Sequence, residues 1–177
     1  RLPQTLAAHI PPLALFPLEP HAVGVSAAKW HLNSRDQFNK PEFPQPDDHG
    51  YDYWMTTHNN ASPSHENPVN FIRNGKPVGK TEGFSAQIVA KEAIHWLKEI
   101  RNPKKPFVLS VWTHEPHLPI ATDQRFLDLY EQHKNRKYMG NISQLDHALG
   151  MIMKALNETG EADNTILIFT SDNGPEG

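Results

Sequence analysis

Residues 107–117, Phe-Val-Leu-Ser-Val-Trp-Thr-His-Glu-Pro-His, are the stretch that decides the fold. The run Phe107–Trp112 is apolar and does not alternate with polar residues, as is typical of a strand covered on both faces. It stops at the polar cluster Thr113–His117. Because ligands bind beyond the carboxyl ends of the strands in open α/β sheets, this stretch predicts a strand that delivers site residues.

Two more apolar runs end in the same way. Residues 22–28 lead into Lys29-Trp30-His31, and residues 165–170 lead into Ser171-Asp172-Asn173-Gly174. A lone histidine is usually an ordinary surface or core residue, but three such strand ends together indicate a shared active-site rim. We therefore expect these two clusters and His114 to converge on one cleft at the carboxyl edge of one sheet.

The segments between the apolar runs carry helical patterns. Phe84–Arg101 repeats apolar residues at helical spacing and is stopped by Asn102-Pro103. Tyr138–Thr159 has the same repeat and precedes Gly160, a residue typical of the position just past a helix. The alternation of helix and strand predicts an α/β fold, part of an α/β/α sandwich with a mixed, mostly parallel sheet.

Two stretches are rich in proline. Residues 11–20 hold four prolines, which excludes a regular helix there, so we expect residues 1–26 to be atypical or poorly ordered. Residues 41–80 hold six prolines and predict a long irregular loop. A loop of this length is uncommon in a compact domain and is usually functional or disordered.

The bulk composition limits the possible partners. A chain of 177 residues is long enough for one buried domain. Its formal charge of -3 gives no basic face for nucleic acid, and no apolar run approaches the ~18–20 residues of a membrane helix. The absence of cysteine excludes disulfides and thiolate metal sites. We expect neither nucleic acid nor a membrane as a partner, and nothing here indicates an oligomeric state.

The strand-end clusters each have a chemical and a plainer interpretation. Asp172 and Asn173 offer hard oxygen donors, which suit Ca²⁺ or Mg²⁺, although a turn or a helix cap is the plainer interpretation. Lys29 and His31 pair a permanent cation with a group that titrates near neutrality, as binding and proton transfer at an anion require. A solvated lysine and a packed histidine are the alternative.

The loop that holds His114 and His117 is more specific, because Pro116 and Pro119 restrict its backbone as a rigid site requires. Zinc is the competing interpretation of the two histidines. Their spacing in a proline-bearing loop does not place both on one helix face, which disfavours zinc.

Taken in order, the three clusters resemble the sulfatase family. Residues 29–33, Lys-Trp-His-Leu-Asn, resemble its Gly-Lys-Trp-His-Leu-Gly block. Residues 113–119, Thr-His-Glu-Pro-His-Leu-Pro, resemble its His-x-Pro-His-x-Pro segment, and residues 170–174 resemble its metal-binding Asp-Asn-Gly strand end. The resemblance covers about residues 27–177 and places the blocks in the family's order.

The resemblance implies an alkaline-phosphatase-like fold and hydrolysis of sulfate monoesters of a carbohydrate or an aryl alcohol. Lys29 and His31 would face the nucleophile and the sulfate, with His31 as the base that helps to release sulfate. His114 would be the general acid on the leaving oxygen, and His117 would bind substrate. Family members are extracytoplasmic (periplasmic, secreted or lysosomal), and we expect the same here.

The same resemblance implies that Asp172 and Asn173 form half of a calcium (or magnesium) site, and that residues 41–80 are the substrate-side loop. The family nucleophile is a formylglycine made from Cys or Ser in Cys/Ser-x-Pro-Ser-Arg, and nothing upstream of Lys29 fits it. Residues 61–65, Ala-Ser-Pro-Ser-His, imitate that motif with Ala and His at its two functional positions, so we interpret them as a decoy.

We therefore expect residues 1–177 to be part of one sulfatase catalytic domain, with the nucleophile in upstream sequence and no turnover by these residues alone. Two other functions stay open. One is a phosphodiesterase or phosphonate hydrolase of the same superfamily, which the Lys-Trp-His block disfavours. The other is a non-catalytic domain that binds sulfated glycans.

Overall fold

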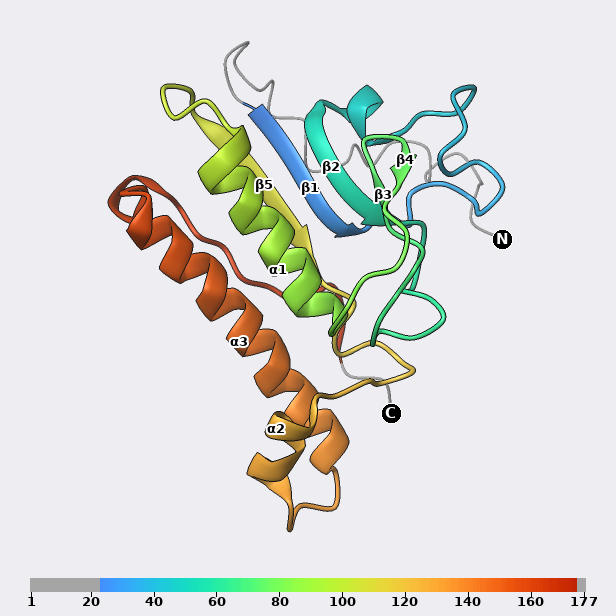
Figure 1. Cartoon of the computed structure of the whole chain (residues 1–177), viewed down its shortest axis with the longest axis vertical. Coiled ribbons are helices and arrows are strands. Elements are labelled where there is room, and N and C mark those ends of the chain that lie inside the picture. The colour runs from blue at the N-terminus through green and yellow to red at the C-terminus, as the bar shows by residue number, and fades with distance from the viewer. Residues whose placement is uncertain (1–22, 175–177) are drawn as a thin grey trace, which may run out of the picture.

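The computed structural model describes residues 23–174. Its sheet has the strand order β4-β3-β2-β1-β5 (Figure 1). The strands are β1 (Val23–Lys29), β2 (Tyr51–Thr57), β3 (Ile72–Arg73), β4 (Lys76–Pro77) and β5 (Phe107–Trp112). The helices are α1 (Ser85–His95, continued by a π-helical turn over Trp96–Ile100), α2 (Gln124–Leu127) and α3 (Arg136–Glu158), with short 3-10 helices at Pro46–His49, Asp128–Tyr130 and Ala162–Asn164.

The three long strands are parallel. β1 lies between β2 and β5 and pairs in parallel with both, whereas β3 and β4 extend the sheet beyond β2 as short antiparallel strands. Ala28 lies opposite Thr56 on one side and Trp112 on the other, so the three parallel strands end level with one another. The predicted mixed, mostly parallel α/β sheet is confirmed.

Helices α1 and α3 pack against each other, and α1 lies against the sheet (Figure 1). On α1, the small buried residues Ala86, Ala90 and Ala93 allow this close approach, and they share one core with residues of α3 such as Ile152. Both predicted helices are confirmed, with boundaries within two residues of those expected.

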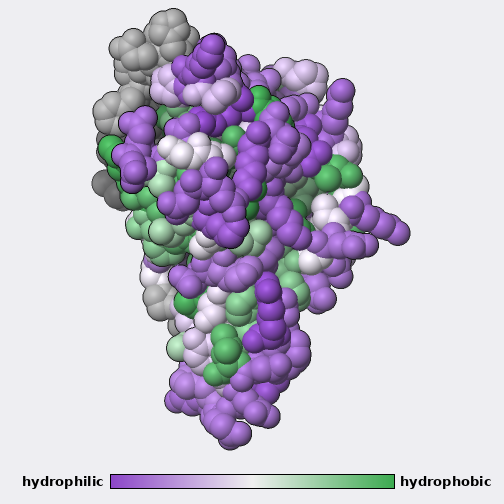
Figure 2. All heavy atoms as spheres, turned by 60° about the vertical axis from the view of Figure 1, so that its left-hand side comes forward, coloured by the Kyte–Doolittle hydropathy of each residue, from purple (hydrophilic) through white to green (hydrophobic). Residues whose placement is uncertain are grey.

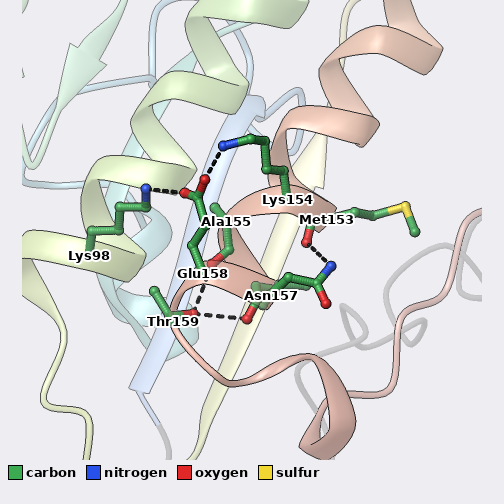
Figure 3. Close-up of polar contacts among 8 residues, drawn as sticks. Lys98, Met153, Lys154, Ala155, Asn157, Glu158 and Thr159 are labelled. Carbon is green, nitrogen blue, oxygen red and sulfur yellow. Dashed lines mark hydrogen bonds and ion pairs between the residues drawn. The ribbon is translucent and has the colours of Figure 1, made fainter.

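Local chemistry ends the two helices where the sequence predicts. Arg101, just before Asn102-Pro103, is extended, and Gly160 has a φ of 72° after α3. Close to these ends, the Glu158 carboxylate accepts a hydrogen bond from Lys98 Nζ at 2.5 Å and also pairs with Lys154 (Figure 3). The pair with Lys98 joins the end of α3 to the turn that continues α1.

The predicted loop over residues 41–80 is wrong in its central part, because it contains β2. Tyr51–Thr57 reads Tyr-Asp-Tyr-Trp-Met-Thr-Thr, and every residue except Asp52 is buried. Aromatic and β-branched residues favour strands, but the charged Asp52 and the prolines on the N-terminal side hid this one. The remainder of the stretch is mostly irregular, apart from the short strands β3 and β4.

The predicted strand over residues 165–170 is also wrong, because the segment has no regular structure. Ile166 is 91% exposed and Phe169 is 66% exposed. A strand forms only when a neighbour pairs with its backbone and its side chains are covered, and the described residues supply neither. In Figure 1 the segment after α3 runs in the same direction as β5 without joining the sheet.

The prediction for residues 22–28 is confirmed, since β1 spans Val23–Lys29. The expectation that residues 1–26 are atypical or poorly ordered is wrong for residues 23–26, which belong to β1, and residues 1–22 lie outside the described residues. Figure 2 shows a largely hydrophilic face with small hydrophobic patches. Between residues 23 and 174, no helix combines the length and the apolar character needed to cross a membrane.

Candidate active site

The sheet brings residues from three distant segments to one edge. Lys29 lies opposite Thr57, and pairing continues past the strand ends, where the His31 amide donates to the His58 carbonyl at 2.7 Å. Because β5 ends level with β1, His114 follows at the same edge. The strand-end prediction therefore holds for β1 and β5, and β2 adds residues that the sequence did not single out.

The Lys-Trp-His block is anchored through its central residue. Trp30 is 2% exposed and stacks on Trp112 with ring centroids 6.1 Å apart, while its Nε1 donates to Asn33 Oδ1 at 2.7 Å. The anchor holds the half-buried Lys29 and the exposed His31 on either side of it. His31 has a φ of 48°, a conformation uncommon outside Gly and Asn that is concentrated at functional sites.

His114 is buried and its tautomer follows from its contacts. Its Nε2 lies 2.8 Å from Thr57 Oγ1, and that hydroxyl donates its one hydrogen to the Asn59 carbonyl at 2.5 Å. The hydroxyl must therefore accept from His114, so Nε2 carries the proton and Nδ1 carries a lone pair. Burial first, and then His65 and Lys29, lower the pKa of His114 to about 3.

His65, which belongs to the segment that we interpret from the sequence as a decoy motif, also lies at the candidate site. Its side chain is fully buried and its ring centroid lies 5.3 Å from that of His114. Burial first, and then His117 and Lys29, lower its pKa to about 4. Its backbone carbonyl accepts from the Ser85 amide at 2.8 Å, which fixes it at the start of α1.

Glu115 anchors the loop that carries His114. Its Oε1 accepts from Ser85 Oγ at 2.7 Å and from the Ala86 amide at 3.0 Å, and Gln144 Nε2 approaches from α3 at 3.4 Å. The carboxyl group is 4% exposed, and burial raises its pKa despite these donors. This contact ties the loop after β5 to two helices.

His117 is exposed on the same loop. Its amide donates to the His114 carbonyl at 2.8 Å, so the two residues lie in one tight turn. Its charge acts on His31, His65 and His114. The structure thus brings together the predicted residues Lys29, His31, His114 and His117.

These residues form one basic cluster. It comprises Lys29, His31, His58, His65, His114 and His117. Every charged side chain that acts on the pKa of His31, His65 or His114 is itself basic, and each lowers that pKa. Such a cluster favours an anion, because a bound negative charge would relieve the mutual repulsion.

Asp172 and Asn173 are not linked to this cluster by any described contact. Both are exposed and irregular, and Asn173 Nδ2 donates to the neighbouring Gly174 carbonyl at 3.1 Å. Within residues 23–174, no group of three or more His, Cys, Asp or Glu is arranged to hold a metal ion. The described residues do not complete a metal site, and the assignment of Asp172 and Asn173 as ligands stays a prediction.

A model of the family named Sulfatase matches residues 22–177. The chain belongs to the sulfatase family. Two relatives are the uncharacterized sulfatase YdeN of Escherichia coli (strain K12), 27% identical over 172 residues, and the N-acetylgalactosamine-6-sulfatase of Homo sapiens, 28% identical over 161 residues. The matches cover 84% and 82% of this chain, but only 30% and 29% of the two relatives.

Solved structures confirm the alkaline-phosphatase-like fold. Ps i-CgsB in complex with k-i-k-neocarrahexaose has a TM-score of 0.67 at 21% identity, and the match covers 81% of this sulfatase chain and 35% of that one. BT4656, in complex with its substrate D-glucosamine-2-N,6-O-disulfate, has a TM-score of 0.62 at 16% identity, with 81% and 46% covered. Sulfatases generally use a metal ion and a formylglycine.

Proposed function

We propose that this chain forms part of the catalytic domain of a sulfuric ester hydrolase whose substrates are sulfated carbohydrates. The observation that carries the proposal is the basic cluster. Among the described residues, every charged side chain that acts on the pKa of His31, His65 or His114 is basic, whereas the carboxylate of Asp36 interacts with His58. The cluster lies at the carboxyl edge of the parallel strands, where α/β enzymes bind ligands.

The charge of the cluster fits a sulfate ester better than a phosphate monoester. A sulfate monoester carries one negative charge, and the cluster holds one permanent cation, Lys29, among histidines. Burial holds His65 and His114 neutral until an anion arrives. A dianionic phosphate would favour more fixed positive charge.

The roles that we assign to the residues of the basic cluster follow their exposure to solvent. Lys29 and His31 stand where they can contact the sulfate oxygens, and His31 accepts the proton when sulfate is released. His114 lies deeper and donates to the leaving oxygen from Nδ1, because its Nε2–H is held by Thr57. His117 is exposed beside them and contacts the sugar.

The nucleophile and the metal ion come from groups outside this set. In sulfatases a formylglycine supplies the nucleophile, and the metal ion polarises it together with a sulfate oxygen. We assign Asp172 and Asn173 to binding Ca²⁺ or Mg²⁺, since a carboxylate and an amide oxygen are hard donors.

The sugar part of the substrate is suggested by the relatives. One relative is an N-acetylgalactosamine-6-sulfatase, and the substrate of BT4656 is a disulfated glucosamine. We propose a substrate of the same general kind, a carbohydrate sulfate, and an extracytoplasmic location.

The test measures sulfate release from aryl and carbohydrate sulfates by the protein in its full natural length. Lys29→Ala and His114→Ala should each lower kcat/KM at least about 100-fold, the usual loss for a charge-stabilising or acid–base group. His95→Gln removes an exposed histidine of α1 outside the basic cluster and serves as the matched control. Binding of a sulfated glycan without release of sulfate would show a non-catalytic domain, and faster cleavage of a phosphodiester would show the other hydrolase class.

A further inference from the structure

His65 is buried without any hydrogen-bond partner. Its side chain is 0% exposed, and within the described residues neither Nδ1 nor Nε2 has a protein partner. A buried polar group left unpaired costs stability, so native proteins keep few of them, and a catalytic role is one of the accepted reasons for an exception.

His114 also has one ring nitrogen without a hydrogen-bond partner. Its Nε2–H is held by Thr57, so Nδ1 is the one ring atom that can take up a proton, and it is buried without a partner among residues 23–174. The rings of His65 and Phe71 pack against His114, with centroids 5.3 Å and 5.9 Å away. Of these two neighbours, only His65 has a nitrogen lone pair that can share a proton.

We propose that His65 is a positioning residue for His114: the two imidazoles form one buried pair that takes up a single proton from solvent when a sulfate-class anion binds. The inference rests on the proposed function, because the anion would enter beside Lys29 and His31. The shared proton is the one that His114 later presents to the leaving oxygen.

The charges around the pair support uptake of one proton and not two. Lys29 at the end of β1 and His117 on the loop after β5 act on both rings, and His65 opposes protonation of His114. The carboxyl group of Glu115, on the same loop, is engaged by Ser85 and Ala86. Without an anion, the Asn59 backbone is the one described group that raises the pKa of His114, and burial and the neighbouring basic side chains outweigh it.

An anion reverses this balance. An opposite charge within about 4–6 Å raises the pKa of a neighbouring group by about 1–3. Starting from a pKa of about 4 for His65, the pair would then titrate between about pH 5 and pH 7. Proton uptake on binding should therefore be measurable near pH 6.

The experiment is calorimetric titration of the protein in its full natural length with inorganic sulfate near pH 6, in two buffers of different ionisation enthalpy. Wild type should take up roughly half a proton per sulfate bound. His65→Leu, which keeps the volume but has no lone pair, should reduce the uptake at least about threefold. His65→Gln keeps an acceptor oxygen, so its proton uptake should lie between those of wild type and His65→Leu. The proton uptake of His95→Gln should equal that of wild type.

A second measurement does not depend on the variants. Nitrogen chemical shifts of the histidine rings in wild type should show His114 protonated at Nε2 without sulfate, and a proton at its Nδ1 shared with His65 when sulfate is bound. Sulfate binding without these changes, or equal uptake by wild type and His65→Leu, would overturn this inference alone. No binding of sulfate at all would overturn it together with the proposed function.

Discussion

Removing the carboxylate of Glu115 should loosen both the fold and the active site. The side chain joins the loop of His114 to the first turn of α1 and to Gln144 on α3. In Glu115→Ala, the Ser85 hydroxyl and the Ala86 amide lose their acceptor inside the protein. The loop would then keep its covalent connections but lose its link to the helices.

The expected loss follows from these contacts. A hydrogen bond to a charged group contributes roughly 1.5–3 kcal/mol, so the two short bonds from Ser85 and Ala86 contribute roughly 3–6 kcal/mol. The raised pKa of Glu115 indicates that desolvation outweighs the charge-dependent part of these bonds, so most of the loss comes from leaving the Ser85 and Ala86 donors unpaired. We expect a net loss of about 2–4 kcal/mol, which lowers Tm by roughly 5–15 °C in a chain of this size.

Glu115→Gln is the matched variant, because it keeps an acceptor oxygen but no charge. The folded-state pKa of Glu115 is raised above its unfolded value, so folding favours its protonated form. Wild-type stability therefore falls as pH rises from the unfolded pKa of about 4.5 through the folded one. A glutamine side chain does not titrate, so the Glu115→Gln variant lacks this decrease in stability with rising pH. Its stability relative to wild type should therefore increase across that pH range.

Urea unfolding from about pH 4 to pH 8, read by tryptophan fluorescence, measures both effects. Activity of the protein in its full natural length adds a third result: Glu115→Ala should lower kcat more than Glu115→Gln does, because only the former releases the His114 loop. A Glu115→Ala variant as stable as wild type, or a Glu115→Gln variant with the wild-type dependence on pH, would contradict these assigned contributions of Glu115.

Two further pairs of variants test the packing and the assigned roles. Gly140→Ala places a Cβ 2.9 Å from the Phe126 carbonyl oxygen and should lower the folding stability by about 1–3 kcal/mol. Gly150→Ala in the same helix meets nothing within 4 Å and should raise the folding stability by about 0.5–1 kcal/mol. Thermal unfolding measures both changes. Asp172→Ala should abolish metal-dependent turnover while changing Tm by less than about 2 °C, since the residue is exposed. His117→Ala should alter substrate preference but leave some turnover, and the reverse pattern for Asp172 and His117 would show that their roles are misassigned.

The sequence predicted the elements whose signal is local. β5 is an apolar run with one polar residue, Ser110, and both long helices show a helical repeat with a recognisable stop, so the structure has them where expected. β2 was missed because its strand character depends on burial between β1 and β3, which the pattern does not record. Residues 165–170 were overpredicted for the opposite reason, since a strand pattern does not ensure a pairing neighbour.

The candidate site also contains residues that local sequence predicts and residues that depend on tertiary packing. Lys29, His31 and His114 could be found because they follow apolar runs, whereas His65 could not, because its role depends on packing against a residue 49 positions later. Residues 61–65 also resemble a nucleophile motif in which His65 stands at a functional position, so the sequence indicates a mismatch there and not a buried site residue. A better signal was available in the polar composition of residues 58–67, which supply buried Asn and His atoms around His114.

The composition of the basic cluster fits the proposed sulfuric ester hydrolase, which would convert a singly charged ester into a doubly charged product. Fixed cations would hold the released sulfate dianion more tightly than the ester, which slows product release. Histidines avoid this, because their charge depends on the ligand and on the proton that the reaction itself moves. Within the cluster, Lys29 is the permanent cation, while burial lowers the pKa values of His65 and His114 and keeps both neutral near pH 7 in the absence of an anion. In the proposed mechanism, His114 gives its proton to the leaving oxygen before sulfate is released, so the pair would already be neutral when sulfate leaves.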